Sequence, residues 1–304
     1  MSNVIAVIWD FDKTLVNGYM QDPIFKAYKV DSTEFWQEVA ELPKKYEEQG
    51  VRINKDTIYL NHFINNAKKG GCLEGLNNAK LRAFGKQLKF YNGVPEIFSK
   101  TEKLIENNTA YQEYGIKVEH YVVSTGFAEE IRGSEVMQYV KGVWGCEFIE
   151  SIENESEPVI SEIGYAIDNT SKTKALFEIN KGIPLHPEID VNAKMDEKVR
   201  RVRFENMIYI ADGPSDIPAF SLVNKNGGST FAIYPAKDKN AFRQVEQMRQ
   251  DGRIQMYAEA DYSEGTTAYM WICNTIERYA QRMYLEEKGN LEQSVSNSPR
   301  HLNV

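Results

Sequence analysis

Cysteines are scarce in this 304-residue sequence, and long apolar runs are absent from it. Cys72, Cys146 and Cys273 are odd in number and far apart, so they fit neither a disulfide framework nor a zinc site. No segment approaches the ~18 apolar residues of a membrane span, and the apolar segment Val4–Trp9 is too short for a signal peptide. We therefore expect reduced thiols, with Cys146 buried in a strand, no membrane partner and a cytoplasmic location.

Positively charged residues are also fewer than negatively charged ones. The chain carries 36 lysines and arginines against 44 aspartates and glutamates, a formal net charge of -8. Proteins bind nucleic acids mainly through lysine and arginine contacts to phosphate, so we expect no nucleic-acid partner. The exception is one basic run, Lys198–Arg203, whose interleaved valines favour an exposed edge strand or helix over a nucleic-acid patch.

Histidine, the side chain that most readily changes its charge near neutral pH, occurs four times. None of the four lies beside the candidate catalytic residues below, and we expect structural or incidental roles for His62, His120, His186 and His301. Any catalysis is therefore expected to depend on other groups.

One apolar stretch that is present ends abruptly in acids. Val4–Trp9 has the pattern of a strand that is buried on both faces, as in a parallel sheet covered by helices. Asp10 and Asp12 follow it directly. Because the carboxyl ends of strands in open α/β sheets face the ligand crevice, these carboxylates are candidates for a functional site. The alternative is that both aspartates only begin a turn.

Three later segments also place polar groups at the ends of strands or helices. One apolar run ends in the hydroxyl of Ser124, and Lys172 and Lys174 lie at the start of a helical pattern. A further apolar run ends at Asp212, with Asp216 four residues later. The order along the chain is therefore an acid pair, a hydroxyl, a lysine and a second acid pair.

The segment between the first two of these motifs has helical periodicity. Asp22, Asp31 and Asp56 are each placed to begin a helix, and Leu73–Leu88 supplies another. We therefore expect an all-helical insertion over residues 16–91.

After this insertion, strands and helices alternate, as in a doubly wound parallel sheet. We expect an α/β core made of residues 1–15 and 92–288, with a long aromatic helix over Thr266–Glu287 near its end. Gly182–Asn206 is expected to be a surface insertion, and residues 289–304 are polar enough to form a disordered tail.

Together the four motifs resemble those of the haloacid dehalogenase superfamily, which has Asp-x-Asp-x-Thr, a strand-terminal Ser or Thr, a Lys, and a Gly-Asp-Gly-x-x-Asp type loop in the same order. The branch that looks most similar contains phosphoserine phosphatase, with a helical cap between the first and second motifs. Ala211 stands in place of the usual glycine before Asp212, and Thr125 replaces the glycine after Ser124. Neither change removes a catalytic group. The resemblance implies a Rossmann-like core with the insertion as its cap.

The resemblance also implies a chemistry. It is that of a Mg²⁺-dependent phosphomonoester hydrolase acting on a small phosphorylated metabolite, in which Asp10 attacks phosphorus to form an aspartyl-phosphate and Asp12 acts as general acid and base. Ser124, Thr125 and Lys172 would bind the phosphate. The implied Mg²⁺ ligands are the Asp10 side chain, the Asp12 backbone carbonyl, Asp212 and Asp216.

Several residue roles stay open. Lys172 is preferred to Lys174 because its spacing to Leu176 resembles that of the family's lysine. Asp216 would hold a water of the metal or orient Lys172, or it simply occupies a helix start that favours any acid. Thr14 is expected to brace the first motif's loop.

The function also has alternatives. A dehalogenase lacks the second aspartate, so Asp12 favours a phosphatase, whereas a phosphotransferase or phosphomutase would keep every motif. A non-catalytic phosphometabolite-binding protein is the alternative outside enzymes. The substrate itself cannot be read from the sequence, and the candidate specificity residues in the insertion are Tyr19, Gln21, Arg52 and Tyr59.

Overall fold

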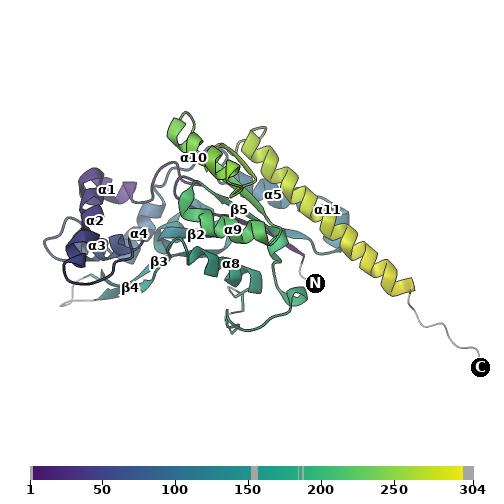
Figure 1. Cartoon of the computed structure of the whole chain (residues 1–304), viewed down its shortest axis with the longest axis horizontal. Helices are drawn as coiled ribbons and strands as arrows, with labels where there is room; N and C mark the ends of the chain where they lie inside the picture. Colours follow the sequence, from purple (N-terminus) through teal and green to yellow (C-terminus); the bar gives the residue numbers. More distant parts are fainter. Residues whose placement is uncertain (1–2, 152–156, 184, 187, 297–304) are drawn as a thin grey trace, which may run out of the picture.

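A seven-stranded sheet, with strand order β4-β3-β2-β1-β5-β6-β7, runs through the centre of the molecule (Figure 1). The computed structural model describes residues 3–151, 157–183, 185–186 and 188–296. All neighbouring strands are parallel except β3 and β4, which pair antiparallel at one edge. The strands are β1 (Val4–Trp9), β2 (Lys117–Phe127), β3 (Val140–Ser151), β4 (Val159–Tyr165), β5 (Met207–Ala211), β6 (Ser229–Tyr234) and β7 (Met256–Glu259). The expected α/β class is confirmed, and the antiparallel edge strand is an addition to it.

The first strand lies in the middle of this sheet, and all six of its residues are buried. Such burial requires helices on both faces, and Figure 1 shows α5 and α11 on one side and α8 and α9 on the other. The helices outside the insertion are α5 (Glu96–Glu106), α6 (Thr109–Glu113), α7 (Ala128–Gly133), α8 (Lys172–Lys181), α9 (Ile217–Lys225), α10 (Lys239–Gln250) and α11 (Thr267–Ser296), with short 3-10 turns between them.

Four helices form the expected insertion between β1 and α5, and they gather beyond one end of the sheet (Figure 1). They are α1 (Asp22–Tyr28), α2 (Ser32–Glu47), α3 (Ile58–Ala67) and α4 (Asn78–Gly85). The Asp31 side chain caps α2 as expected, by accepting the N–H groups of Thr33 and Glu34. The cap expected from Asp56 is wrong, because α3 begins after Thr57 and no side chain caps it.

The insertion is joined tightly to the sheet. Its two connections run side by side, since Tyr91 N–H donates to the carbonyl of Leu15 at 2.9 Å and Asn17 N–H donates to that of Lys89 at 2.8 Å. Aromatic side chains bridge the remaining interface, with Phe63 of α3 packed edge-on against Phe127 of β2 at 4.9 Å between ring centroids. The insertion therefore has a fixed place over the carboxyl end of β2.

The C-terminal helix is longer than expected. It was predicted to end at Glu287, ahead of a disordered tail over 289–304, but α11 continues to Ser296 and residues 297–304 lie outside the described part of the chain. Gly289 lies within the helix, because a single glycine costs a helix only about 1 kcal/mol relative to alanine. The correction therefore concerns residues 289–296.

The basic run Lys198–Arg203 also differs from its prediction. It forms no edge strand, and its only helical part is the end of a 3-10 turn over Glu197–Val199. Its arginines bind protein groups: Arg200 binds Asn180, Arg201 binds Glu119 and Arg203 binds Glu286. Among the described helices, none combines the length and apolar character needed to cross a membrane.

Candidate active site

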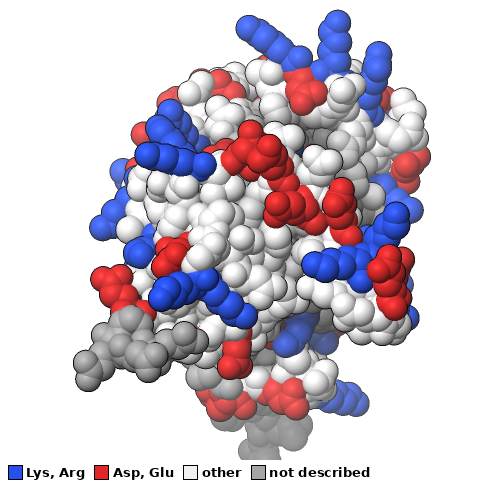
Figure 2. Space-filling view, turned by 90° about the vertical axis from the view of Figure 1, so that its left-hand side faces the viewer, with Lys and Arg blue, Asp and Glu red and all other residues white. Residues whose placement is uncertain are grey.

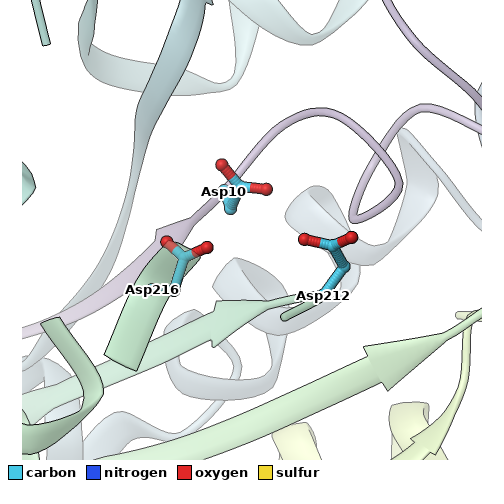
Figure 3. Close-up of side chains that lie close together, drawn as sticks. All are labelled: Asp10, Asp212 and Asp216. Carbon is cyan, nitrogen blue, oxygen red and sulfur yellow. The ribbon is translucent and has the colours of Figure 1, made fainter. Parts of the chain in front are cut away.

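Three carboxylates converge at the carboxyl edge of the sheet. Asp10 follows β1 and Asp212 follows β5, and these strands are parallel neighbours, with Asp10 N–H donating to the carbonyl of Ile210 at 2.8 Å. Asp216 lies in the turn that begins α9. One oxygen from each of the three aspartates falls within 4.8 Å of the others (Figure 3). The parallel register therefore brings together acids that are about two hundred residues apart in the chain.

Lys172, the first residue of α8, is the cation inside this cluster. Only 1% of its side chain is exposed, and its Nζ lies 2.7 Å from Asp10 Oδ1 and 2.6 Å from Asp216 Oδ1. Burial alone would lower the pKa of Lys172, but the two carboxylates outweigh it and raise the pKa, so the ammonium stays charged. Lys174 instead is half-exposed and pairs with Glu178 at 3.5 Å. The structure thus brings Lys172, and not Lys174, to the predicted site.

Asp216 is fully buried and bound on several sides. Besides Lys172, the Tyr209 hydroxyl donates to its Oδ1 at 2.6 Å, and Ser215 Oγ donates to its Oδ2 at 2.8 Å. Asp216 thus contacts Lys172 directly, at 2.6 Å, while its other oxygen is bound by Ser215. Tyr209 was missed from the sequence, although a tyrosine inside an otherwise apolar strand requires a partner for its hydroxyl.

Negative charge exceeds positive charge in the cluster. Burial, only partly offset by Lys172, and repulsion from Asp216 raise the pKa of Asp10 to about 6. Burial and repulsion from Asp10 and Asp216 raise the pKa of Asp212 to about 7. The three carboxylates outweigh Lys172 and the more distant charge of Lys13, and an all-oxygen donor set of this charge fits a divalent cation such as Mg²⁺.

Asp12 is not one of the three converging carboxylates. Its Oδ1 accepts the backbone N–H of Met20 at 2.8 Å, at the start of the insertion. Burial and repulsion from Asp10 raise the pKa of Asp12 well above its usual value, so this carboxyl can carry a proton that it can donate. The two acids of the first motif therefore have different surroundings, as their predicted roles require.

The hydroxyl motif lies at the same edge of the sheet. Trp9 pairs with Val122 in the β1–β2 register, so Ser124 comes one residue beyond the position opposite Asp10, at the same edge of the sheet. Ser124 is buried and its Oγ accepts the N–H of Gly126 at 3.0 Å. A Cβ at position 126 would overlap Met20 Sδ and Cε, so a larger residue there would have to displace the end of the buried Met20 side chain.

Two threonines near these acids have different environments. Thr14 is buried and its Oγ1 donates to Asp10 Oδ2 at 3.2 Å, which matches its expected role as a brace of the first loop. Thr125 is partly exposed, and its carbonyl accepts a hydrogen bond from the Tyr59 hydroxyl of α3. That bond ties the insertion to the second motif.

A pocket of about 460 Å³ opens between the insertion and the second motif. Its lining includes Tyr19, Gln21 and Tyr59, which were predicted as specificity candidates, but not Arg52. Trp36 was missed, because its helical spacing in α2 resembles that of a core residue. The remaining lining residues are Asp12, Thr125 and Gly126.

None of the described histidines lies in the site. His120 is buried and bound between the Trp9 indole, at 3.1 Å, and Thr101, at 3.0 Å, and burial lowers its pKa to about 3. His301 lies outside the described residues. Cys146 is buried in β3, as expected.

Comparisons with known proteins place this chain in a family and a fold. No protein-family model matches it. An uncharacterized protein of Borreliella burgdorferi is 37% identical over 288 residues, which cover 90% of this chain and 97% of that protein.

The crystal structure of a HAD family hydrolase from Salmonella enterica serovar Typhi aligns with a TM-score of 0.50 and 13% identity, covering 84% of this chain and 67% of that one. A phospho-aspartyl intermediate analogue of phosphoserine phosphatase aligns with a TM-score of 0.47 and 16% identity, covering 84% and 93%. The chain therefore belongs to the same family as the Borreliella protein and has the fold of the haloacid dehalogenase superfamily.

Proposed function

We propose that this protein is a Mg²⁺-dependent phosphomonoester hydrolase that acts on a small phosphorylated metabolite through an aspartyl-phosphate on Asp10. The observation that carries the proposal is the buried Lys172, held between Asp10 and Asp216 beside Asp212 at the carboxyl edge of a haloacid dehalogenase fold. Such a site offers a nucleophile and compensation of charge together, which phosphate-monoester hydrolysis requires because its uncatalysed rate is extremely slow.

The acidic cluster would hold the cation. Asp10, Asp212 and Asp216, with the backbone carbonyl of Asp12, form the proposed ligand set, and the raised pKa values of Asp10 and Asp212 mark the uncompensated charge. When bound, Mg²⁺ supplies Lewis-acid stabilisation and reduces the repulsion between carboxylate and phosphate.

In the first step, a carboxylate oxygen of Asp10 attacks phosphorus and the bond to the ester oxygen breaks. The protonated Asp12 gives its proton to that leaving oxygen, so the alcohol departs neutral. Lys172, Ser124 and Thr125 are proposed to bind the phosphoryl oxygens, where fixed charges and donors stabilise the developing charge.

In the second step, Asp12, now ionised, takes a proton from a water that attacks the phosphorus. The bond from phosphorus to Asp10 breaks, inorganic phosphate is released and both aspartates return to their starting states. Met20 N–H holds the Asp12 carboxylate in place through both steps, since the same bond suits either protonation state.

The proposed substrate is a small molecule and not a nucleic acid. The face formed by the insertion carries acidic side chains across its middle, with lysines and arginines dispersed toward its margins (Figure 2). This visible face has no continuous basic stripe of the kind that phosphate backbones bind. Three free cysteines among the described residues fit the proposed cytoplasmic location.

A phosphate-release screen over phosphorylated metabolites, with Mg²⁺ or with chelator, tests the function. We expect Mg²⁺-dependent release that falls by at least about 10³-fold in Asp10→Asn, which is nearly isosteric. Residual activity within about tenfold of the wild type would exclude Asp10 as nucleophile. Undiminished rates after exhaustive chelation would exclude the cation, and transfer to an added alcohol in place of water would identify a phosphotransferase.

A further inference from the structure

Three aromatic side chains form the walls of the pocket beside Asp12. Trp36 of α2 and Tyr59 of α3 lie 5.8 Å apart between ring centroids and are tilted by 49°. Tyr19, from the loop before α1, lines the same pocket. Aromatic side chains favour flat, unsaturated partners, which they contact through stacked or edge-on arrangements.

The core of the insertion explains Tyr59, which is 7% exposed and packs on Phe63, but it does not fully explain the other two walls. Phe35, Phe63 and Phe127 fill that core and are almost completely buried. Tyr19, in contrast, leaves 46% of its surface exposed, and Trp36 is only partly covered. Aromatic surface that is left open inside a pocket is available to a ligand.

Tyr19 is also held in position. Lys13 has a φ of 55°, a left-handed conformation that is uncommon for residues other than glycine, and its Nζ lies 4.3 Å from the centroid of the Tyr19 ring. A cation over the ring face is a favourable contact. The contact with Lys13 therefore helps to hold one wall of the pocket in place.

Gln21 supplies the pocket's polar group. The Gln21 side chain lines the pocket, and the residue is 4% exposed. Within the described residues, no hydrogen bond to its side-chain amide is found. Gln21 occupies the N-cap position of α1, but its side chain does not cap that helix. The amide is not among the buried, unpaired polar groups of the described residues, so its polar atoms reach the open space of the pocket. A side-chain amide carries a hydrogen-bond donor and an acceptor in one plane. The edge of a nitrogen heterocycle carries complementary groups in its own plane and can pair with such an amide.

We propose that the substrate is the phosphate monoester of a planar nitrogen heterocycle, such as a nucleoside 5′-monophosphate, with the ring against Tyr19, Trp36 and Tyr59 and its edge hydrogen-bonded to Gln21. This inference rests on the proposed phosphatase function. The volume of about 460 Å³ lies within the range of small-molecule sites and accommodates a ring with its linker. Asp12 lies in the same lining, so the leaving oxygen would face the group that protonates it.

The test compares kcat/KM for nucleoside 5′-monophosphates and pyridoxal 5′-phosphate with that for phosphoserine, glycerol phosphate and sugar phosphates. We expect at least about tenfold higher kcat/KM for one of the heterocyclic esters, in line with the energy of base–aromatic stacking. The two kinds of heterocyclic ester distinguish a nucleobase from a pyridine ring.

Matched variants assign the preference to the pocket. Tyr19→Leu and Gln21→Met should each reduce the preference for the best heterocyclic ester over glycerol phosphate about tenfold. Phe242→Leu and Gln138→Met remove an aromatic ring and an amide elsewhere. Phe242 is 41% exposed and packs on Tyr234 and Tyr257 at the opposite edge of the sheet. Both controls should leave the preference unchanged.

A binding measurement separates this inference from the proposed function. Indole fluorescence of Asp10→Asn should change on titration with the best nucleoside 5′-monophosphate or pyridoxal 5′-phosphate, and the change should be lost in Asp10→Asn combined with Trp36→Phe. Equal or better turnover of the aliphatic esters would overturn the substrate class while leaving the phosphatase intact. If no ester is hydrolysed, the phosphatase fails, and the titration alone then decides: saturable binding at Trp36 supports the pocket assignment, and its absence overturns it.

Discussion

Two buried carboxylates on neighbouring strands, Asp10 after β1 and Glu119 near the start of β2, have opposite electrostatic surroundings. Glu119 binds Arg201, accepts the Tyr121 hydroxyl at 2.6 Å and lies 3.1 Å from Lys117 Nζ. Burial alone would raise the pKa of Glu119, but these partners outweigh burial and lower it.

Asp10 shares one lysine with Asp216 and lies close to Asp212 as well, and its pKa is raised to about 6. The difference in the number of positive partners distinguishes two kinds of buried acid in one fold. A carboxylate with enough cationic and hydroxyl partners stabilises the structure, whereas one left short of positive charge is prepared to bind a cation or a reacting group.

Among the variants that keep the nucleophile, the largest effect is expected from removing the shared lysine. Lys172→Met should lower kcat/KM for phosphoester hydrolysis by about 10²–10³-fold, because it removes a fixed charge next to the nucleophile. Lys174→Met, two residues away and solvent-exposed, should stay within about twofold of the wild type.

If Lys172→Met fails to fold at pH 8, the comparison can be made at pH 6, where Asp10 and Asp212 bind protons more readily. Equal losses in both lysine variants would contradict the assignment of Lys172.

Replacing Glu119, whose charge is balanced by its partners, should give the reverse result, a loss of stability without a loss of activity. Glu119→Gln leaves Arg201 without its charged partner and should lower the free energy of unfolding by about 2 kcal/mol, while kcat at a permissive temperature stays near that of the wild type. Denaturant unfolding and steady-state kinetics on the same preparation measure both quantities. A large loss of kcat with unchanged stability would show that Glu119 takes part in the site.

A smaller effect, on the pH dependence of stability, sharpens the comparison. The folded pKa of Asp212, about 7, lies above the usual 3.8, so its contribution to stability is full below about pH 4 and is lost as pH rises through 7. Without divalent cation, the difference in Tm between Asp212→Asn and the wild type should therefore grow in favour of the variant from pH 5 to pH 8.

Added Mg²⁺ should raise the Tm of the wild type at pH 8, by binding the folded state, and should raise that of Asp212→Asn less. His120, whose pKa is lowered to about 3, gives the opposite slope, with stability lost as pH falls below about 6.5, and it is common to both proteins. A constant Tm difference across this pH range would contradict the uncompensated charge at Asp212.

The sequence was sufficient to identify the site residues that stand in recognisable motifs along the chain. The family resemblance implied that Asp10 and Asp212 share a site, and in the structure both follow neighbouring parallel strands, whose ends lie at the same edge of the sheet. Lys172 was preferred to Lys174 because its spacing to Leu176 resembles that of the family's lysine, and the structure brings Lys172 to the cluster.

Other features depend on contacts between distant segments, which periodicity does not reveal. The Tyr209 hydroxyl on Asp216, the Met20 N–H on Asp12 and the opening of Trp36 into the pocket each require the packed chain. The length of α11 was missed for a different reason, since Gly289 and a polar composition resemble the end of a helix but do not end one.

The central claim is that the undercompensated Asp10 is the nucleophile. The direct measurement is mass spectrometry of peptides from protein that is mixed with a turned-over phosphoester and Mg²⁺ and quenched rapidly in acid, where acyl-phosphates persist longest. We expect one phosphoryl group on the peptide that contains Asp10 in the wild type, and none in Asp10→Asn under the same conditions. Turnover with a phosphoryl group on another residue, or on the Asp10→Asn peptide, would contradict the account.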